Sequence, residues 1–413
     1  MLSSLFILAD TGDIIIEKHW RGIINRSICE YFWDQKISAE SEGSSVAPVI
    51  TTPKYYLVNI KRTTIYFLGV LQNECSPLLV VDFLQRIYDV FIDYFGQNLN
   101  ESIIRDNFVH VYQLIEEMAD NGFPFTTEPN FLKEMIKPPN VVSNLLQGVT
   151  GTSNISDNLP NGSLGAIQWR KTGIKYTSNE IFFDIIEEID CIIDSNGFVV
   201  SCEVNGEIQV NCKLSGMPDL TLTFNNPRML DDVSFHPCVR YSRWENDRVL
   251  SFIPPDGSFK LMNYRIKGIN QLPIYVKPQI SFGEGGGRVN VLVGSKNTNN
   301  KPVENVFVTI PFPKTTTAVN LTSNVGGHFT EDKVCKWNIG KIPKEKTPML
   351  SGNVVLAAGQ PLPEANPSIM VQFKIAMFTI SGLGVDSLAC SEKYKPFKGV
   401  RSVTRAGKFQ VRA

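Results

Sequence analysis

The residue with the clearest chemical potential is a carboxylate inside an apolar run. Residues 181–186 read Ile-Phe-Phe-Asp-Ile-Ile, a strand-like segment that Asp184 alone interrupts. Because burying a carboxylate without partners is costly, Asp184 must face solvent, pair with a base or line a recessed site. A gatekeeper charge on an edge strand and a ligand-binding group both fit this pattern.

Other residues with reactive side chains fit turns and loops better than chemistry. Asp231, Asp232 and His236 are more typical of an inter-strand loop than of an acid/base or metal group. Asp256 lies in Pro-Pro-Asp-Gly, where tight turns favour Asp-Gly. The glycines of 283–287 lack the Gly-Lys-Ser/Thr ending of a phosphate-binding loop, and no helix pattern follows them. We therefore predict a hairpin turn there.

Composition argues against catalysis, metals and nucleic acid. The chain has no Gly-x-Ser-x-Gly elbow, its eight cysteines form no Cys-x-x-Cys pair, and its four histidines lack zinc-ligand spacing. Forty Lys and Arg against forty-one Asp and Glu give a formal charge of -1, so no global field attracts nucleic acid. We expect a protein that is not an enzyme and needs no cofactor.

The N-terminal third has the pattern of a small α+β domain. Short strands are predicted at 2–8, 13–18, 55–60 and 64–71, and a helix at 26–37. Apolar residues recur at helical spacing from Leu79 to Tyr94, and again from Ile103 to Met118, before Gly122 and Pro124. The domain should be a sheet covered by amphipathic helices.

The segment 138–166 is rich in Pro, Asn, Gly, Ser and Thr, and we predict a linker there. The apolar run at the N-terminus ends at Asp10, too short for an ordinary signal peptide. Nothing approaches the ~18–20 apolar residues that span a bilayer. A cytosolic protein with only peripheral membrane contact is the expectation.

From Trp169 onward the pattern is β throughout. Strands are predicted at 181–186, 189–193, 198–204, 207–213, 219–224, 248–253, 258–264, 289–294, 304–310, 369–380 and 399–404, with turns that include Asn205-Gly206. One immunoglobulin-like sandwich takes about 100 residues. This half is much longer, so we predict two sandwich subdomains.

Four segments carry a resemblance to a known family: Ile167–Tyr176, Asn179–Asp184, Leu214–Pro218 and Phe252–Gly257. In order and spacing they resemble the medium (mu) subunits of heterotetrameric clathrin-adaptor-type complexes, and the C-terminal segment 401–412 is most similar to the third adaptor type. The resemblance implies a longin-like α+β domain at 1–137, the linker at 138–166, and an all-β mu-homology domain at 167–413.

Family members bind sorting signals of the form Tyr-x-x-Φ, where Φ is bulky and apolar, as an added strand. The resemblance implies a tyrosine pocket and a separate Φ pocket. Phe182, Asp184, Arg401 and Lys213 would line the tyrosine pocket, with Asp184 accepting the phenol hydrogen and Arg401 lying over the ring. The Φ pocket would be lined by Ile181, Phe183, Val385, Leu388 and Val400.

Two departures from the family pattern affect the tyrosine pocket. Gly399 stands where many members have Trp, and Asn211 replaces a common Lys, although Lys213 is nearby. Both changes should weaken the tyrosine contact or admit different neighbouring residues.

The resemblance also implies partners and a route. Two large subunits and one small subunit would complete the complex, and cargo tails would come from membranes on the route from endosome or trans-Golgi to lysosomes and related organelles. Phosphoinositides, clathrin and a small GTPase are further partners of such complexes. Arg240, Arg243 and Arg248 could form a phosphoinositide-binding face, although scattered solvated charge is the simpler interpretation. The alternative functions are a structural coat subunit without peptide binding and a medium subunit of another adaptor type.

Overall fold

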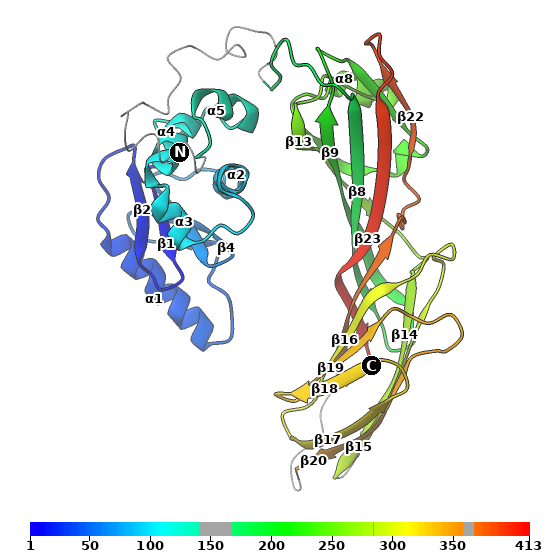
Figure 1. Cartoon of the computed structure of the whole chain (residues 1–413). Coiled ribbons are helices and arrows are strands. Elements are labelled where there is room, and N and C mark those ends of the chain that lie inside the picture. The colour runs from blue at the N-terminus through cyan, green and yellow to red at the C-terminus, as the bar shows by residue number, and fades with distance from the viewer. Residues whose placement is uncertain (140–166, 168, 284, 358–366) are drawn as a thin grey trace. The chain divides into compact units, whose positions relative to one another are not determined.

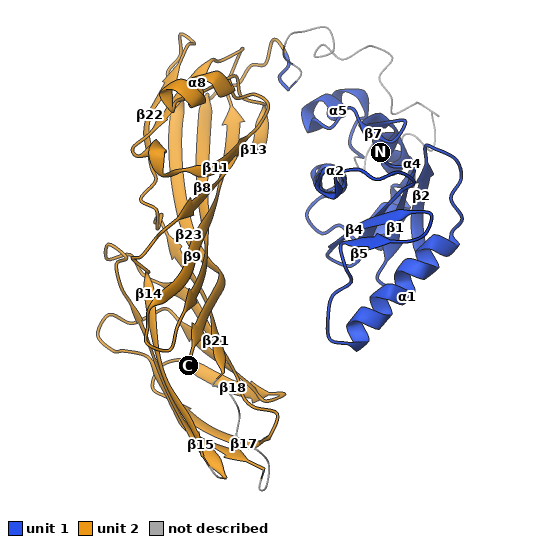
Figure 2. Cartoon of the chain, turned by 180° about the vertical axis from the view of Figure 1, so that it is seen from behind, with its two compact units in different colours: residues 1–171 blue, residues 172–413 orange. Residues whose placement is uncertain are grey.

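The computed structural model describes residues 1–139, 167, 169–283, 285–357 and 367–413. These form two compact units, residues 1–171 and 172–413 (Figure 1, Figure 2). The predicted linker 138–166 lies almost entirely outside the described residues.

The first unit is an antiparallel sheet with helices on both faces. Its main strands are β1 Ser4–Ala9, β2 Ile14–His19, β3 Val49–Thr51, β4 Tyr56–Arg62 and β5 Ile65–Leu71, in the order β2-β1-β5-β4-β3. Its helices are α1 Ser27–Ser41, α2 Pro77–Phe95, α3 Glu101–Asp106, α4 Phe108–Met118 and α5 Pro129–Met135, and β6 Ala119–Asp120 pairs with β7 Phe123–Pro124.

Two apolar clusters explain why β1 and β5 read as continuous apolar runs. On one face of the sheet Leu5 and Phe67 pack with α2 and α4, and on the other Phe6 and Leu68 pack with Phe32 of α1. Strands buried on both faces lose the alternation of a half-exposed strand. The predicted helix from 103 to 118 is wrong in one respect, because Asn107 separates α3 from α4 and its side chain bonds to the Ile103 carbonyl.

The second unit is β throughout, apart from short helices. A nine-stranded sheet has the order β11-β13-β9-β8-β23-β21-β16-β19-β18, and smaller sheets have the orders β12-β10-β22 and β14-β15-β20-β17. Their bounds are β8 Glu180–Ile193, β9 Val199–Lys213, β10 Leu220–Phe224, β11 Asp231–Phe235, β12 Leu250–Phe252, β13 Gly257–Lys267, β14 Ile274–Gly283, β15 Gly286–Ser295, β16 Glu304–Pro311, β17 Thr316–Ser323, β18 Gly327–Glu331, β19 Val334–Gly340, β20 Met349–Leu356, β21 Ser368–Ala376, β22 Val385–Cys390 and β23 Phe397–Arg412. The helices are η1 Pro227–Met229 and α8 Tyr241–Asp247.

Long strands run between the two ends of this unit. In Figure 1, β22 lies near one end of β8 and β23, and β15, β17 and β20 lie at the other end. The predicted fold class is confirmed: an α/β unit precedes a largely β unit. The pairing of Gly283 with Gly286 also confirms the predicted hairpin turn.

The predicted turn at Asn205-Gly206 is wrong, because β9 continues through it. Gly206 pairs with Glu187 of β8 on one side and with Tyr264 of β13 on the other. A Cβ on Gly206 would lie 2.0 Å from Cζ of Tyr264, so the glycine is needed to let that ring pack against the strand. The predicted strands 181–186 and 189–193 are likewise one strand, β8.

A buried carboxylate lies at the centre of this sheet. Glu187 is 0 % exposed, and its carboxylate accepts hydrogen bonds from the Tyr264 hydroxyl at 3.0 Å, from the Ser381 backbone N–H at 3.2 Å and from the Ser381 hydroxyl. Burial raises the pKa of Glu187, and the hydrogen bonds from Ser381 and Tyr264 only partly oppose that rise.

We expect Glu187→Gln to flatten the pH dependence of stability. A carboxyl whose pKa is raised by folding stabilises the protein below its unfolded pKa of 4.5, and this contribution is lost as pH rises through the folded pKa. The melting temperature of the parent minus that of the variant should therefore fall from pH 5 to pH 8. A one-unit rise in that pKa corresponds to about 1.4 kcal/mol.

Thermal melts of the full chain between pH 5 and pH 8 would measure this difference. Glu188→Gln is the matched control, because Glu188 is the next residue of β8 on its exposed face. A difference that is constant with pH for Glu187→Gln would contradict the prediction.

Candidate functional site

Strand β8 separates the predicted site residues onto two faces. Odd-numbered residues from Ile181 to Ile193 are buried, and even-numbered residues are half-exposed. Phe182 and Asp184 therefore lie on the outer face of the sheet. Ile181 and Phe183, at 0 % and 1 % exposure, lie on the inner face within the core. The period of a strand is two residues, so neighbours in the sequence belong to different faces.

Asp184 is paired with a base. Strand β23 runs parallel to β8 with Arg401 opposite Asp184. The Arg401 guanidinium donates from Nε to Oδ1 at 2.6 Å and from Nη2 to Oδ2 at 2.8 Å. The hydrogen bond to Asp184 raises the pKa of Arg401. The Asp184 side chain keeps 32 % of its surface exposed, so its carboxylate can accept a further hydrogen bond.

An aromatic pair flanks this ion pair. A Cβ on Gly399 would lie 2.5 Å from Cδ1 of Phe182, so the Phe182 ring occupies the space that a larger residue at 399 would need. The Phe182 ring also packs against Phe397, with ring centroids 5.9 Å apart. Phe397 is 63 % exposed. Sequence reasoning missed Phe397, although its place two residues before Gly399 puts it on the same face of a strand.

Lys213 lies at the margin of this outer-face group. It is opposite Glu180, two residues from Phe182 on the same face, and its Nζ lies 3.2 Å from Glu180 Oε1. Asn211 is directly opposite Phe182. The structure thus brings Phe182, Asp184 and Arg401 together, and it places Lys213 one step away along β9.

The residues expected to accept Φ come from two sheets. Val400 is opposite Phe183 on the inner face and is 38 % exposed. Val385 and Leu388 are half-buried on β22, which pairs with β10 in the three-stranded sheet. Ile181, Phe183 and Val400 share the inner face of the nine-stranded sheet, opposite to Asp184.

Among the described residues, no strand pairs with the start of β23 on the side away from β8, so this edge is open. Residues 397–406 pair with β8, whereas the pairing of β23 with β21 begins only at Val403. The backbone N–H of Phe397 bonds to the Asn179 carbonyl on the β8 side, and the Ser402 carbonyl accepts from Met377 on the other side. Because consecutive residues of a strand point to opposite sides, the backbone groups of Lys398 and Val400 face the open edge.

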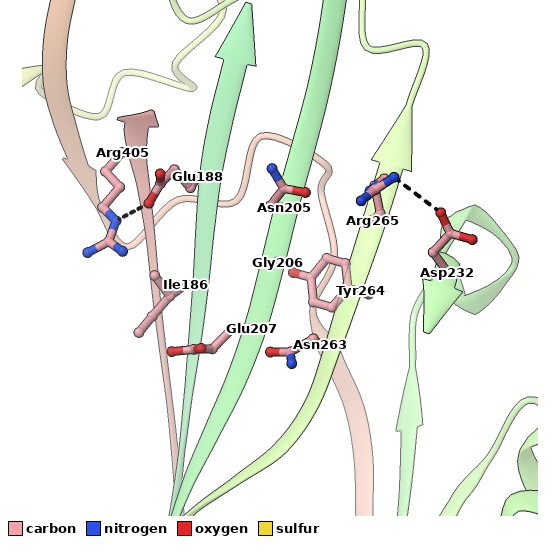
Figure 3. A pocket seen from close by; sticks show the side chains of 10 residues that line it. All are labelled: Ile186, Glu188, Asn205, Gly206, Glu207, Asp232, Asn263, Tyr264, Arg265 and Arg405. Atoms are coloured by element: carbon pink, nitrogen blue, oxygen red, sulfur yellow. Dashed lines mark hydrogen bonds and ion pairs between the residues drawn. The ribbon is translucent and has the colours of Figure 1, made fainter. Parts of the chain in front are cut away.

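A hollow lies further along the outer face (Figure 3). It is lined by Ile186, Glu188, Asn205, Gly206, Glu207, Asp232, Asn263, Tyr264, Arg265 and Arg405. Arg405 donates to Glu188 at 3.0 Å, and Arg265 lies 3.5 Å from Asp232. The Glu188–Arg405 pair thus repeats the Asp184–Arg401 pair four residues further along the same two strands.

The remaining candidates have structural partners. Asp231 and Asp232 begin strand β11, so the predicted loop there is wrong, and His236 packs on the Phe259 ring. The Tyr176 hydroxyl donates to Asp256. Within the described ranges, no His, Cys, Asp and Glu residues are grouped so as to hold a metal ion.

The three arginines considered for a phosphoinositide face have local partners. Arg240 donates to both oxygens of Asp219 at 2.7 and 2.9 Å, and Arg243 pairs with Asp247 at 3.3 Å. Arg248 lies over the Trp244 ring, 5.5 Å from its centroid. The charges of Arg240 and Arg243 are therefore paired with carboxylates on the protein itself.

Comparison with known proteins agrees with this architecture. A model described as the adaptor complexes medium subunit family matches residues 167–413. The chain is 71 % identical over 421 residues to "AP-3 complex subunit mu" of Dictyostelium discoideum and 50 % identical over 419 residues to "AP-3 complex subunit mu-1" of Homo sapiens, each with 100 % of both chains covered. A chain in a homology model of the full-length AP-3 complex, in an intermediate open conformation, shares the fold with a TM-score of 0.63 at 16 % identity over 100 % of both chains.

The chain belongs to the adaptor complexes medium subunit family. The resemblance to the third adaptor type is confirmed by the full-length identities. Membership of this non-enzymatic family also confirms that the protein is not an enzyme. Among the described residues, none of the helices has the length and apolar character to cross a membrane.

Proposed function

We propose that this chain is the cargo-recognition subunit of a heterotetrameric adaptor complex and binds Tyr-x-x-Φ signals beside the open edge of β23. The observation that carries the proposal is the coincidence of three features: the free backbone groups of Lys398 and Val400, the Asp184–Arg401 pair on one face, and apolar residues on the other. An extended peptide gains main-chain bonds at such an edge and specificity from pockets for alternate side chains.

The spacing of the signal matches the two faces. Tyr and Φ are three positions apart, so in an extended peptide their side chains point to opposite faces. A tyrosine on the outer face reaches Phe182, Asp184 and Arg401. The Φ side chain then points to the inner side, toward Val400 of β23 and toward Val385 and Leu388 of β22. A separation by an even number of positions would place both side chains on the same face, where they could not reach both groups.

The outer face suits an unmodified phenol. Asp184 accepts the phenol hydrogen, a charge-assisted bond of roughly 1.5–3 kcal/mol, and the Phe182–Phe397 pair supplies apolar contact for the ring. Arg401 lies beside the ring, where a cation–π contact contributes roughly 0.5–2 kcal/mol. A phosphate on that tyrosine would bring about two negative charges to Asp184 and repel it.

The first unit supplies the contacts to the rest of the complex. Large apolar side chains remain exposed on it, including Leu78 at 77 %, Phe108 at 55 % and Phe125 at 73 %. Such surfaces are typical of protein interfaces, and we assign them to the large adaptor subunits, with one small subunit completing the complex. The complex would act on the cytosolic face of Golgi and endosomal membranes, in transport toward lysosomes, with phosphoinositides, clathrin and a small GTPase as its further partners.

Titration calorimetry of the full chain with a Tyr-x-x-Leu peptide tests the proposal. We expect saturable binding that is lost with Ala in place of Tyr and is at least about tenfold weaker with phosphotyrosine, since 1.4 kcal/mol of repulsion is a factor of ten. Absence of binding by the unmodified peptide would favour the alternative of a purely structural coat subunit.

A further inference from the structure

The buried carboxylate Glu187 links the sheet to the segment that leads into β22. Residues 377–384 connect β21 with β22, and Ser381 in this segment bonds to Glu187 through both its hydroxyl and its backbone N–H. The Ser381 hydroxyl also accepts from the Leu383 N–H at 3.0 Å. The carboxylate therefore fixes a turn that ends directly before Val385.

A second buried residue holds the same turn from β23. Thr404 is 0 % exposed; its hydroxyl donates to the Phe378 carbonyl at 3.0 Å and accepts from the Ile380 N–H at 3.1 Å. The turn is thus bonded to β8 through Glu187 and to β23 through Thr404. These two strands carry the outer-face site, and β22 carries Val385 and Leu388.

We propose that Glu187 is a positioning residue for Φ recognition, which holds β22 at the distance from β23 that lets Val385 and Leu388 receive the Φ side chain. The inference rests on the proposed function, because it names what fixes the second half of that site. An apolar side chain at position 187 would be expected to stabilise the fold at least as well as the buried carboxylate does. The retained carboxylate, which accepts from Tyr264 of β13 and from Ser381 of the turn, instead ties together elements that side-chain packing alone would leave adjustable.

The same carboxylate offers a matched pair of variants. Ser381→Ala removes the hydroxyl that joins the turn to Glu187, whereas Tyr264→Phe removes a hydroxyl that joins Glu187 to β13, away from the turn. Each variant deletes one hydrogen bond to the same carboxylate, and Ser381→Ala also deletes the bond from the Leu383 N–H within the turn. Only the first weakens the link to β22.

The experiment measures whether each variant loses selectivity for the Φ residue or for the tyrosine hydroxyl of the peptide. With the full chain, the dissociation constants of Tyr-x-x-Leu and Tyr-x-x-Ala give the Φ ratio, and those of Tyr-x-x-Leu and Phe-x-x-Leu give the hydroxyl ratio. In the parent protein we expect a Φ ratio of about ten or more. Ser381→Ala should reduce the Φ ratio by at least about threefold and leave the hydroxyl ratio unchanged, and Tyr264→Phe should change neither. Equal changes in both variants, or none in either, would overturn the positioning role.

Hydrogen exchange of the backbone amides of 385–390 gives a readout that needs no peptide. Exchange there should be faster in Ser381→Ala than in Tyr264→Phe if the turn positions β22. A parent protein that binds no Tyr-x-x-Leu peptide would refute the proposed function, and with it the inference. Normal peptide binding with identical exchange in the two variants would refute the inference alone.

Discussion

Asp184→Ala should weaken binding of a Tyr-x-x-Leu peptide by about 10–150-fold, the equivalent of roughly 1.5–3 kcal/mol for a hydrogen bond to a charged group. The variant removes the acceptor for the phenol and leaves Arg401 without its bidentate partner. The fold should tolerate the change. With side-chain exposures of 32 % and 68 %, the ion pair lies near the surface, where such pairs contribute about 0–1 kcal/mol.

Glu188→Ala provides the matched control, measured in the same calorimetric titration. Glu188 pairs with Arg405 at 3.0 Å on the same two strands and the same face, four residues along (Figure 3). The Glu188→Ala variant removes an equivalent surface ion pair and leaves the residues that contact the peptide tyrosine unchanged. Peptide affinity should therefore change by less than about twofold. If both variants weakened binding equally, general surface charge and not Asp184 would account for it.

Peptide N-methylation is expected to produce an alternating pattern of losses. A peptide strand beside β23 directs every second backbone N–H toward that strand and the others away from it. Methylating an inward N–H removes a hydrogen bond and places a methyl group between the strands, so we expect at least about tenfold weaker binding there. Methylating an outward N–H should cost less than about threefold. The dissociation constants of a series with one N-methyl group each measure this pattern.

The protein offers a complementary variant at the same edge. Lys398→Pro removes an N–H that faces the open edge and leaves the N–H of Phe397, which bonds to Asn179, in place. Proline is tolerated on an edge strand when its nitrogen faces solvent, so binding should fall while the melting temperature changes little. Uniform losses across the N-methyl series would exclude strand addition, and so would normal binding by this variant.

Local sequence patterns determined much of the first unit and the character of the second. The apolar spacing from Leu79 to Tyr94 predicted α2, because helical periodicity is a local property that packing on a sheet only reinforces. The Asp184 signal was also local: a carboxylate in an apolar run had to be paired, solvated or placed in a site. It is paired and half-exposed, one of the outcomes that the pattern allowed.

Local patterns failed where a neighbour far along the chain decided the outcome. Asn205-Gly206 has the composition of a turn, yet the ring of Tyr264 requires a glycine inside a continuous strand. Glu187 lies in the same alternating pattern as the apolar residues of β8, and only its position on the buried face indicated an unusual role. The Tyr264 ring and the turn at Ser381, which Glu187 contacts, are both far from Glu187 in the sequence.

The amino-acid sequence by itself singled out Asp184, because a carboxylate inside an apolar run is a property of a short segment. The other residues of the two proposed pockets were implied only by the family resemblance. Only the tertiary structure decided that Arg401 lies opposite Asp184, 217 residues away, and that the edge of β23 stays open before Val403. Strand pairing joins distant segments through backbone groups that all residues share, so nothing in a single segment specifies its partner or where that partner ends.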